Sequence, residues 1–371
     1  MSISQIEDII VDDKLHPIIY DNDKFKKLVD NFVIQNQMIS KWSKLDYNIR
    51  MFKRKYSVEL RKMDLVASYK SLNLNKPEFY KIILKKAMRS QSGVLVVTVF
   101  TSAHPEYTDE FGKRQKQNFS CKHNCYYCPN EPAHKDNNWQ AQPRSYLFQE
   151  PAVLRANQHK FLAIGQMLNR LDTYYSNGHV PDKIEIIVEG GTFTEYPQDY
   201  LEDYHRDLFY DCNEYFNIRN AFDNYDNIGT DKLDLNCLKS IRQPGSVEEE
   251  VKINKTAHVH IIGICIETRP DAIDDEWLNL FRKWGITRIQ LGAQHVDNSI
   301  LKKINRGHTV EQLLWAMQYL KDNCFKIDIH IMPDLPGASP DIDKAMFDYV
   351  YSIVCPDQMK VYPCQTVPWT I

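Results

Sequence analysis

The chain has 371 residues, of which 43% are hydrophobic and 26% are charged, and its formal net charge is −3. These values are ordinary for a globular protein with one large domain and a smaller one. The N-terminal stretch is acidic and lacks the apolar core of a signal peptide, and no apolar run is long enough to span a bilayer. We therefore expect a cytosolic protein that does not cross a membrane, in which clustered cysteines bind metal more often than they form disulfides.

Residues 1–90 have the pattern of a mostly helical domain. Their apolar residues recur at three- and four-residue spacing, and the segment contains no glycine. From Lys41 to Arg89 there are 14 Lys and Arg against 4 Asp and Glu, a local charge of +10 that leaves −13 for the remainder. This segregation favours a polyanion-binding surface, and the alternative is a solvated helical face. Aromatic residues alternate with the basic ones; most are expected in the core, and a few are candidates for stacking on bases.

Residues 91–371 have the pattern of an α/β domain. Short β-branched runs alternate with helical patterns such as residues 310–323, which predicts parallel βαβ units in a barrel or an open sheet. The predicted strands cover residues 94–101, 183–189, 258–267, 288–294, 326–332 and 358–363. The sequence also suggests a polar loop over 102–120 and an Asn- and Asp-rich insertion over 209–256.

Polar residues gather where the predicted strands end. In a βα barrel the chemistry takes place at the carboxyl ends of the strands, so these residues are candidates for the site. They are Gly190, Gly191, Thr192, Glu267, Thr268, Arg269, Pro270, Asp271, Gln294, His295, residues 333–337, Lys360 and Tyr362.

Three of the nine cysteines, Cys121, Cys125 and Cys128, lie within eight residues of one another. Three thiolates are one fewer than a closed four-cysteine site requires. In a four-iron cluster, three cysteines leave one iron open to an exogenous ligand, and S-adenosylmethionine (SAM) can chelate that iron through its amino and carboxylate groups. One-electron cleavage of the sulfonium would then give a 5′-deoxyadenosyl radical. Tyr127, before the last cysteine, would lie over the cluster or the adenine edge.

The alternative for the same stretch is zinc. His123 lies between two of the cysteines and would complete a Cys3His knuckle, and His104 or His134 would serve instead. The context favours iron and sulfide, because the cysteines follow the first strand of an α/β domain and a Gly-Gly-Thr sequence ends the next strand. A glycine pair allows close approach of backbone carbonyls to a cofactor amino group.

The sequence resembles the Elongator catalytic subunit family, the radical SAM synthases that carboxymethylate the wobble uridine of tRNA. The motifs that carry this resemblance occur in order over about residues 85–371. They are "MRSQSGVLVVTVFTSAHP", "CKHNCYYCPN", "VPDKIEIIVEGGTF", "GICIETRPD", "TRIQLGAQH", "INRGHTVEQ", "IMPDLPG" and "MKVYP". The resemblance implies a partial TIM-like radical SAM barrel over residues 91–371, preceded by a helical basic tRNA-binding domain over residues 1–90.

The resemblance also implies a reaction and its residues. The 5′-deoxyadenosyl radical would take hydrogen from the methyl group of acetyl-CoA, the carbon radical would add to C5 of uridine, and thioester hydrolysis would leave a carboxymethyl group. An electron donor is needed, and Elongator-like accessory subunits are possible partners. The implied roles are cluster ligation by Cys121, Cys125 and Cys128, acetyl-CoA binding by Lys183, SAM binding by Gly190, Gly191, Thr192, Glu267 and Arg269, and catalysis by Gln294, His295, Lys360 and Tyr362.

Some of these residues also have a purely structural explanation. Lys183 also suits a surface lysine at the start of a strand, and Glu267 and Arg269 also suit an internal ion pair. The family continues into an acetyltransferase-like domain, which we expect this chain to lack because it stops at "QTVPWTI". Cys355 and Cys364 are candidate remnants of a zinc site. Alternatives for the function are a radical SAM enzyme with another substrate, or a catalytically silent tRNA-binding or scaffold protein with a structural iron–sulfur cluster.

Overall fold

The computed structural model of the chain describes residues 22–86, 88, 91–221 and 241–371. The chain divides into two compact units. The first comprises Met1–Val94 and Asp172–Pro181, and the second comprises Leu95–Leu171 and Asp182–Ile371. The acidic N-terminal stretch and the middle of the predicted insertion lie outside the described residues. Among the helices that are described, none combines the length and the apolar character that a bilayer crossing requires.

The first unit is helical, as its apolar spacing predicts. Its helices are α1 (Asn22–Asn36), α2 (Trp42–Tyr56), α3 (Lys62–Ser71) and α4 (Pro77–Ile83). Their apolar faces share one core that includes Phe32, Leu45, Leu65 and Phe79. Of the aromatic residues that alternate with basic ones, Phe52 and Phe79 are buried, whereas Trp42 and Tyr47 are exposed.

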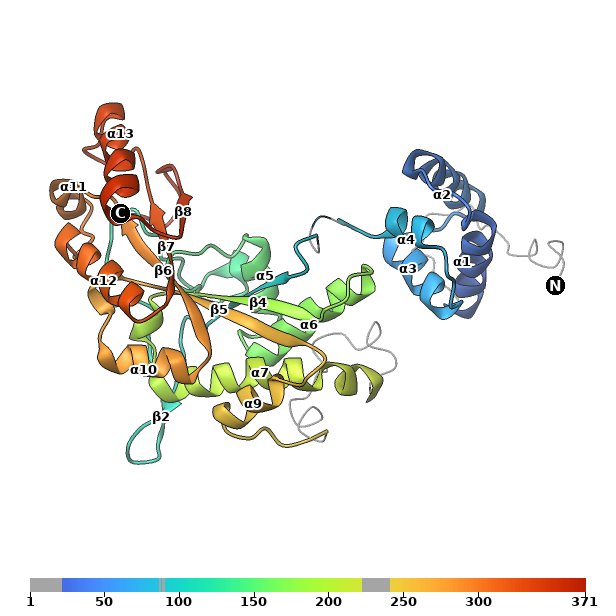
Figure 1. The fold of residues 1–371 in the computed structure, drawn as a ribbon, viewed down its shortest axis with the longest axis horizontal. Helices are drawn as coiled ribbons and strands as arrows, with labels where there is room; N and C mark the ends of the chain where they lie inside the picture. The colour runs from blue at the N-terminus through green and yellow to red at the C-terminus, as the bar shows by residue number, and fades with distance from the viewer. Residues whose placement is uncertain (1–21, 87, 89–90, 222–240) are drawn as a thin grey trace. The chain divides into compact units, whose positions relative to one another are not determined.

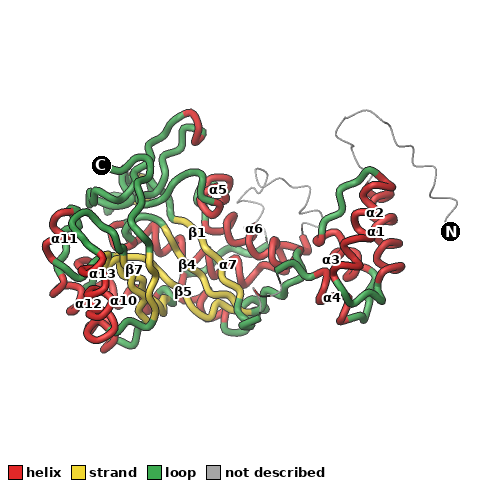
Figure 2. Tube along the Cα trace, turned by 90° about the horizontal axis from the view of Figure 1, so that it is seen from above, coloured by secondary structure: helices red, strands yellow, loops and turns green. Residues whose placement is uncertain are grey.

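The second unit contains a sheet of six parallel strands that curls into a half-barrel, with helices around it (Figures 1 and 2). The strands are β1 (Leu95–Phe100), β4 (Lys183–Glu189), β5 (His260–Thr268), β6 (Ile286–Gln294), β7 (Lys326–Ile331) and β8 (Gln358–Val361), in this spatial order. Each pair of neighbours is parallel. All six strands that the sequence predicts are present, and the predicted α/β fold is confirmed.

Helices connect the strands. They are α5 (Pro151–Gln158), α6 (Ala163–Ser176), α7 (Gln198–Ala221), α9 (Val247–Asn254), α10 (Asp275–Lys283), α11 (Asn298–Lys303), α12 (Val310–Asp322) and α13 (Pro340–Tyr349). Helices α7, α10 and α12 pack on β5, β6 and β7, respectively. Local signals set their ends: the side chain of Thr309 accepts a hydrogen bond from Gln312 N and forms a capping box that begins α12. Ser339 caps α13, which has a proline at its first position.

The two faces of the sheet differ in polarity. Along β4, Ile184, Ile186 and Val188 are fully buried, whereas Glu185 and Glu189 on the opposite face are only partly buried. Because side chains alternate along a strand, the apolar set packs under the helices and the polar set faces the inside of the half-barrel. The inner face is therefore polar, and it leads up to the carboxyl ends of the strands.

Two sequence expectations need correction. Residues 209–221 are not part of an insertion but the second half of α7, where Phe209, Tyr210, Cys212, Tyr215 and Ile218 are buried. The abundance of Asn and Asp concealed an apolar face at helical spacing. The predicted loop over 102–120 contains an antiparallel hairpin, β2 (Glu106–Thr108) and β3 (Arg114–Lys116). These strands have three residues each, too short for a periodic signal.

Candidate active site at the carboxyl ends of the strands

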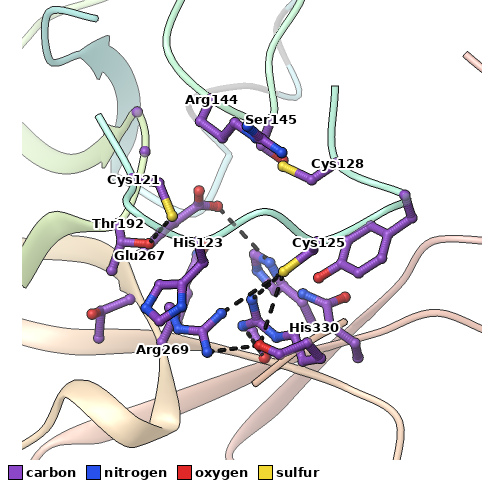
Figure 3. A pocket seen from close by; sticks show the side chains of 18 residues that line it. Cys121, His123, Cys125, Cys128, Arg144, Ser145, Thr192, Glu267, Arg269 and His330 are labelled. Carbon is purple, nitrogen blue, oxygen red and sulfur yellow. Dashed lines mark hydrogen bonds and ion pairs between the residues drawn. The ribbon is translucent and has the colours of Figure 1, made fainter. Parts of the chain in front are cut away.

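A pocket open to solvent, with about 610 Å³ of empty space, lies at the carboxyl ends of the inner strands. Cys121, Cys125 and Cys128 line it together, on the loop that follows the hairpin (Figure 3). Other lining residues come from β4, β5, β6 and β7 or from the turns that follow these strands, and Arg306 comes from the loop after α11. The remaining lining residues are His123, Tyr127, Arg144, Ser145, Gly190, Gly191, Thr192, Glu267, Thr268, Arg269, Gln290, Gly292, Gln294 and His330.

The glycine pair after β4 fastens the cysteine loop to the sheet. Thr192 N donates a hydrogen bond to Ser120 O at 2.9 Å, directly before Cys121. A Cβ atom on Gly191 would lie 1.8 Å from that same oxygen, and one on Gly190 would lie 2.0 Å from Thr101 Oγ1. Only glycine permits this approach, so the pair sets the position of the first cysteine.

Each cysteine sulfur has a donor or a cation beside it. Thr192 Oγ1 donates to Cys121 Sγ at 3.1 Å. Arg269 Nη1 and Arg306 Nη1 lie 3.9 and 3.7 Å from Cys125 Sγ. Burial raises the pKa of Cys128, and Arg144 opposes that shift. Hydrogen-bond donors and cations around the sulfurs are typical of cysteines that bind metal, because they orient the ligands.

This donor set fits an iron–sulfur cluster held by three cysteines. Within the described residues, no three His, Cys, Asp or Glu side chains lie close enough to hold one metal ion. A single zinc ion needs its sulfurs about 3.8 Å apart, given Zn–S bonds of about 2.3 Å, whereas a cluster takes one thiolate at each of three separate corners. Of the three histidines considered for zinc, His123 lines the pocket, and His104 and His134 do not.

Below the cysteines, the pocket reaches a buried polar layer. Tyr146 Oη donates to Glu267 Oε2 at 2.5 Å, and Glu267 Oε1 lies 3.9 Å from His330 Nδ1. Lys360 Nζ donates to Gln290 Oε1 at 2.8 Å. Burial, with Lys360 and Arg306 nearby, lowers the pKa of His330 to about 3, so this imidazole is neutral.

The structure brings most of the predicted site residues together. Cys121, Cys125, Cys128, Gly190, Gly191, Thr192, Glu267, Arg269 and Gln294 all line the pocket. Lys360 and Tyr362 lie close to this group: Lys360 contacts Gln290, and the ring of Tyr362 lies 5.4 Å from that of His330. Tyr127 also lines the pocket.

Two predicted residues lie elsewhere. Lys183 begins β4 and is exposed, so about 20 Å of strand separates it from the end of β4, where the pocket opens. His295 does not line the pocket; it is buried, and its Nε2 lies 3.5 Å from Asp343 Oδ1 on α13. Cys355 and Cys364 are both free thiols.

The suggested ion pair between Glu267 and Arg269 does not form. Arg269 instead pairs with Asp271 at 2.9 Å and donates to Arg306 O at 2.7 Å, and it is only 2% exposed. These bonds turn its Nη1 toward Cys125. Glu267 instead accepts a hydrogen bond from Tyr146 in the polar layer.

Sequence reasoning missed several lining residues, notably Gln290, His330, Arg144 and Arg306. Strand alternation was a usable signal for the first two, since Gln290 shares a face with Gln294, and His330 follows Asp328 by two residues. Arg306 lies in a loop whose sequence, "INRGHT", has no periodicity that predicts where a side chain points.

Comparisons with known proteins agree with this geometry. A family model described as the radical SAM superfamily matches residues 232–347. The tRNA uridine(34) acetyltransferase of Methanocaldococcus infernus is 34% identical over 294 residues, which cover 78% of this chain and 46% of that protein. Elongator complex protein 3 of Homo sapiens is 30% identical over 321 residues, covering 85% and 50%.

A solved structure shows the same architecture. The archaeal Methanocaldococcus infernus Elp3 with an N-terminal deletion superposes with a TM-score of 0.52 at 29% identity, covering 75% of this chain and 47% of that one. The chain spans about half the length of the curated relatives it matches. By its cysteine loop, its half-barrel and these relatives, the chain belongs to the Elongator catalytic subunit family of radical SAM proteins.

Proposed function

We propose that this chain is the radical SAM part of an enzyme that modifies the wobble uridine of tRNA, attaching a carboxymethyl group derived from acetyl-CoA to C5. The observation that carries the proposal is the convergence of three thiols on one pocket at the carboxyl ends of parallel strands. The names of the relatives, tRNA uridine(34) acetyltransferase and Elongator complex protein 3, support uridine as the target and an acetyl group as the source.

Different residues of the pocket would bind the cluster and SAM. Cys121, Cys125 and Cys128 would hold a four-iron cluster, which together with SAM supplies a 5′-deoxyadenosyl radical when bound and reduced by an electron donor. Gly190, Gly191 and Thr192 form the wall beside Cys121 and would receive the SAM amino group.

Other residues would orient the substrates. Arg269 and Gln294 line the same pocket and offer donors for the SAM carboxylate and ribose. Lys360 and Tyr362 lie inside the half-barrel, where the uridine would bind next to the radical. Lys183 is exposed at the start of β4, at the opposite end of the strand from the pocket. Its ammonium group would bind a phosphate of acetyl-CoA that extends around the sheet.

The first test is cofactor chemistry. Protein reconstituted anaerobically with iron and sulfide should bind about four irons, show charge-transfer absorbance near roughly 400 nm, and release 5′-deoxyadenosine from SAM on reduction. Cys125→Ser should lose the cluster and the cleavage, because one corner loses its thiolate. Cys212→Ser, a buried cysteine on α7 outside the pocket, is the matched control and should retain both.

The second test is product formation. Mass spectrometry of tRNA incubated with protein, SAM, reductant and acetyl-CoA should show carboxymethyluridine at the wobble position. Stoichiometric zinc in place of iron, with no SAM cleavage, would overturn the radical SAM assignment. SAM cleavage without modified tRNA would instead leave the radical SAM assignment intact and reject the substrate.

A further inference from the structure

Three large aromatic side chains are exposed around the cysteine loop without lining the pocket. Tyr126 lies between the second and third cysteines, and its side chain is 45% exposed, whereas its neighbour Tyr127 lines the pocket. Trp369 and Trp139 are 47% and 72% exposed, and they do not line the pocket either. We call the surface formed by Tyr126, Trp139 and Trp369 the loop patch.

Backbone hydrogen bonds and a ring contact join the members of the loop patch. Ile371 N donates to Tyr126 O at 3.1 Å, and Ile371 is two residues from Trp369 in the chain. The ring of Trp369 lies 5.3 Å from that of His134, and Trp139 N donates to His134 O at 2.9 Å. The three aromatic side chains therefore belong to one region of the surface. Single exposed apolar residues are ordinary, but a group of aromatic residues is typical of a site where another molecule binds.

Positive charge surrounds the loop patch. Tyr126 N donates to Ile304 O at 3.1 Å, which places Tyr126 beside the last turn of α11 and its two lysines. Over residues 121–139, 298–306 and 365–371, the exposed charged side chains are Lys122, Lys135, Lys302, Lys303 and Asp136. Four cations against one carboxylate favour a partner with an acidic face, because complementary charge speeds association and selects the partner.

The loop patch lies next to the residues that would hold the cluster. Between Cα atoms, Tyr126 is about 3.8 Å from Cys125 and at most about 7 Å from Cys128, because they are one and two residues apart. In the proposed function SAM and the substrate occupy the pocket, so the electron that cleaves SAM has to arrive from outside it. A protein that covers Tyr126 brings its redox centre close to the cysteines without entering the pocket. Electron-transfer complexes bury less than about 1,200 Å² in total, so a small aromatic patch with charges around it is large enough.

We propose that the loop patch is the docking surface for a one-electron carrier protein with an acidic face. This inference rests on the proposed function, because SAM cleavage is the step that consumes the electron. The carrier, a reduced flavin or iron–sulfur protein, is oxidised by one electron, and the cluster held by the three cysteines is reduced by it. The same electron then passes to the sulfonium of SAM and the C5′–S bond breaks, which gives methionine and the 5′-deoxyadenosyl radical and leaves the cluster oxidised again.

Carrier binding is the first test, because it does not depend on SAM cleavage. The probes are two acidic carriers in the oxidised state, a flavodoxin and a two-iron ferredoxin, titrated calorimetrically into the reconstituted full chain at low ionic strength. Lys135→Glu combined with Lys302→Glu reverses two charges at the loop patch and should weaken binding by at least about tenfold. Lys252→Glu combined with Lys255→Glu makes the same charge change and should keep the wild-type affinity. These control lysines are exposed at the end of α9, which precedes β5 and so lies at the opposite end of that strand from the pocket.

Trp369→Ala tests the aromatic part of the patch. It removes the ring but keeps the backbone oxygen that accepts a hydrogen bond from Asn130 N. Carrier binding should weaken by at least about tenfold, because Trp and Tyr side chains often provide much of the binding energy of an interface. Trp315→Ala on α12 is the matched control, because that ring is 52% exposed and also has one aromatic neighbour, Tyr319. Equal affinities in the two tryptophan variants, or in the two charge variants, would overturn the proposal.

The source of the electron separates this proposal from the proposed function. With dithionite, a small reductant that needs no docking surface, both charge variants should release 5′-deoxyadenosine at the wild-type rate per bound cluster. With reduced flavodoxin, the variant at the loop patch should be at least about tenfold slower than the control. Absence of cleavage with either reductant would reject the proposed function, and the binding measurements would still decide the docking surface.

Two further outcomes would overturn the docking surface itself. One is a wild type that binds neither flavodoxin nor ferredoxin. The other is self-association of the wild type that Trp369→Ala abolishes, as measured by analytical ultracentrifugation, because the loop patch would then be a contact with a second copy of the chain.

Discussion

At the scale of single residues, Cys125 has the most positive surroundings of the three cysteines. Arg269 and Arg306 both point a guanidinium at its sulfur, and they are only 2% and 6% exposed. Arg269 is held by Asp271 and by the backbone oxygen of Arg306, which fixes its side chain relative to the loop that carries Arg306. Buried cations act strongly on a nearby charge because water does not screen them.

We predict that Arg306→Gln makes the reduction potential of the reconstituted cluster more negative. Reduction adds negative charge next to this guanidinium, so removing the cation stabilises the oxidised form relative to the reduced form. A redox titration followed by electron paramagnetic resonance, performed without SAM, measures the shift. Arg288→Gln is the control, because Arg288 is a partly buried arginine that does not line the pocket and pairs with Glu185 and Asp328 instead of a cysteine sulfur. An equal shift in both variants would contradict the prediction.

The site was partly predictable from its residues. The spacing of the cysteines and the Gly-Gly-Thr sequence after a strand predicted the pocket wall. Both features depend on residues that are close together in the sequence, so a short stretch of sequence is enough to identify them. Arg306 and Tyr146 were not predictable in this way. Both lie in loops, and only the folded arrangement of those loops brings Arg306 to Cys125 and Tyr146 to Glu267.

At the scale of elements, the strands were predictable and the long helix was not. Parallel strands buried under helices form short β-branched runs, and "LVVTVF" and "KIEIIVE" become β1 and β4. Helix α7 buries several polar residues, among them His205, Asp211 and Glu214, which conceals its buried face. Burial raises the pKa of Asp211, which favours the neutral form of its carboxyl group in these low-polarity surroundings.

The last residues of the chain hold the cysteine loop through two backbone hydrogen bonds. Asn130 N donates to Trp369 O at 3.0 Å, and Ile371 N donates to Tyr126 O at 3.1 Å, so the two bonds bracket Cys128. The Trp369 ring also lies 5.3 Å from that of His134. Together with the bond between Thr192 and Ser120, these contacts fix both ends of the loop.

We predict that Ile371→Pro lowers cluster occupancy. Proline lacks the N–H that reaches Tyr126 O, so the loop around Cys128 loses one of the two backbone hydrogen bonds that join it to the last residues of the chain. Iron and sulfide content after reconstitution, and the rate of iron loss to a chelator, should both show the effect. Ile371→Ala retains the N–H, and the Ile371 side chain is 75% exposed, so this control should match the wild type. Equal iron retention in both variants would show that the tie does not matter.

At the scale of the whole molecule, positive charge is concentrated in the first unit and negative charge in the rest. The structure shows which basic residues of this unit are exposed and which pack against its core. Arg54 and Lys55, in the last turn of α2, are exposed. Lys62 instead lies 3.8 Å above the Trp42 ring and donates to Ile82 O, and burial lowers its pKa. Lys62 therefore packs against the helical core, whereas the last turn of α2 presents two exposed cations.

We predict that replacing both Arg54 and Lys55 with Gln weakens tRNA binding and makes it less dependent on salt. Each phosphate contact releases condensed counterions, so losing two contacts should reduce the slope of log K against log [salt] by about 1.4 to 1.8. Binding of tRNA to the full chain, measured at several salt concentrations, gives both quantities. The effect should be similar for different tRNA sequences, because contacts to phosphate do not read bases.

The control is Lys344→Gln on α13, which removes one exposed lysine from the second unit, where its side chain is 78% exposed. If the first unit carries the RNA contacts, this variant should keep the wild-type affinity and slope. If Lys344→Gln reduces the slope of log K against log [salt] by about half as much as the double α2 variant does, the RNA binds on the second unit. An unchanged slope in the α2 variant would mean that its exposed cations are a solvated helical face, since counterion release depends on charge that the phosphates reach.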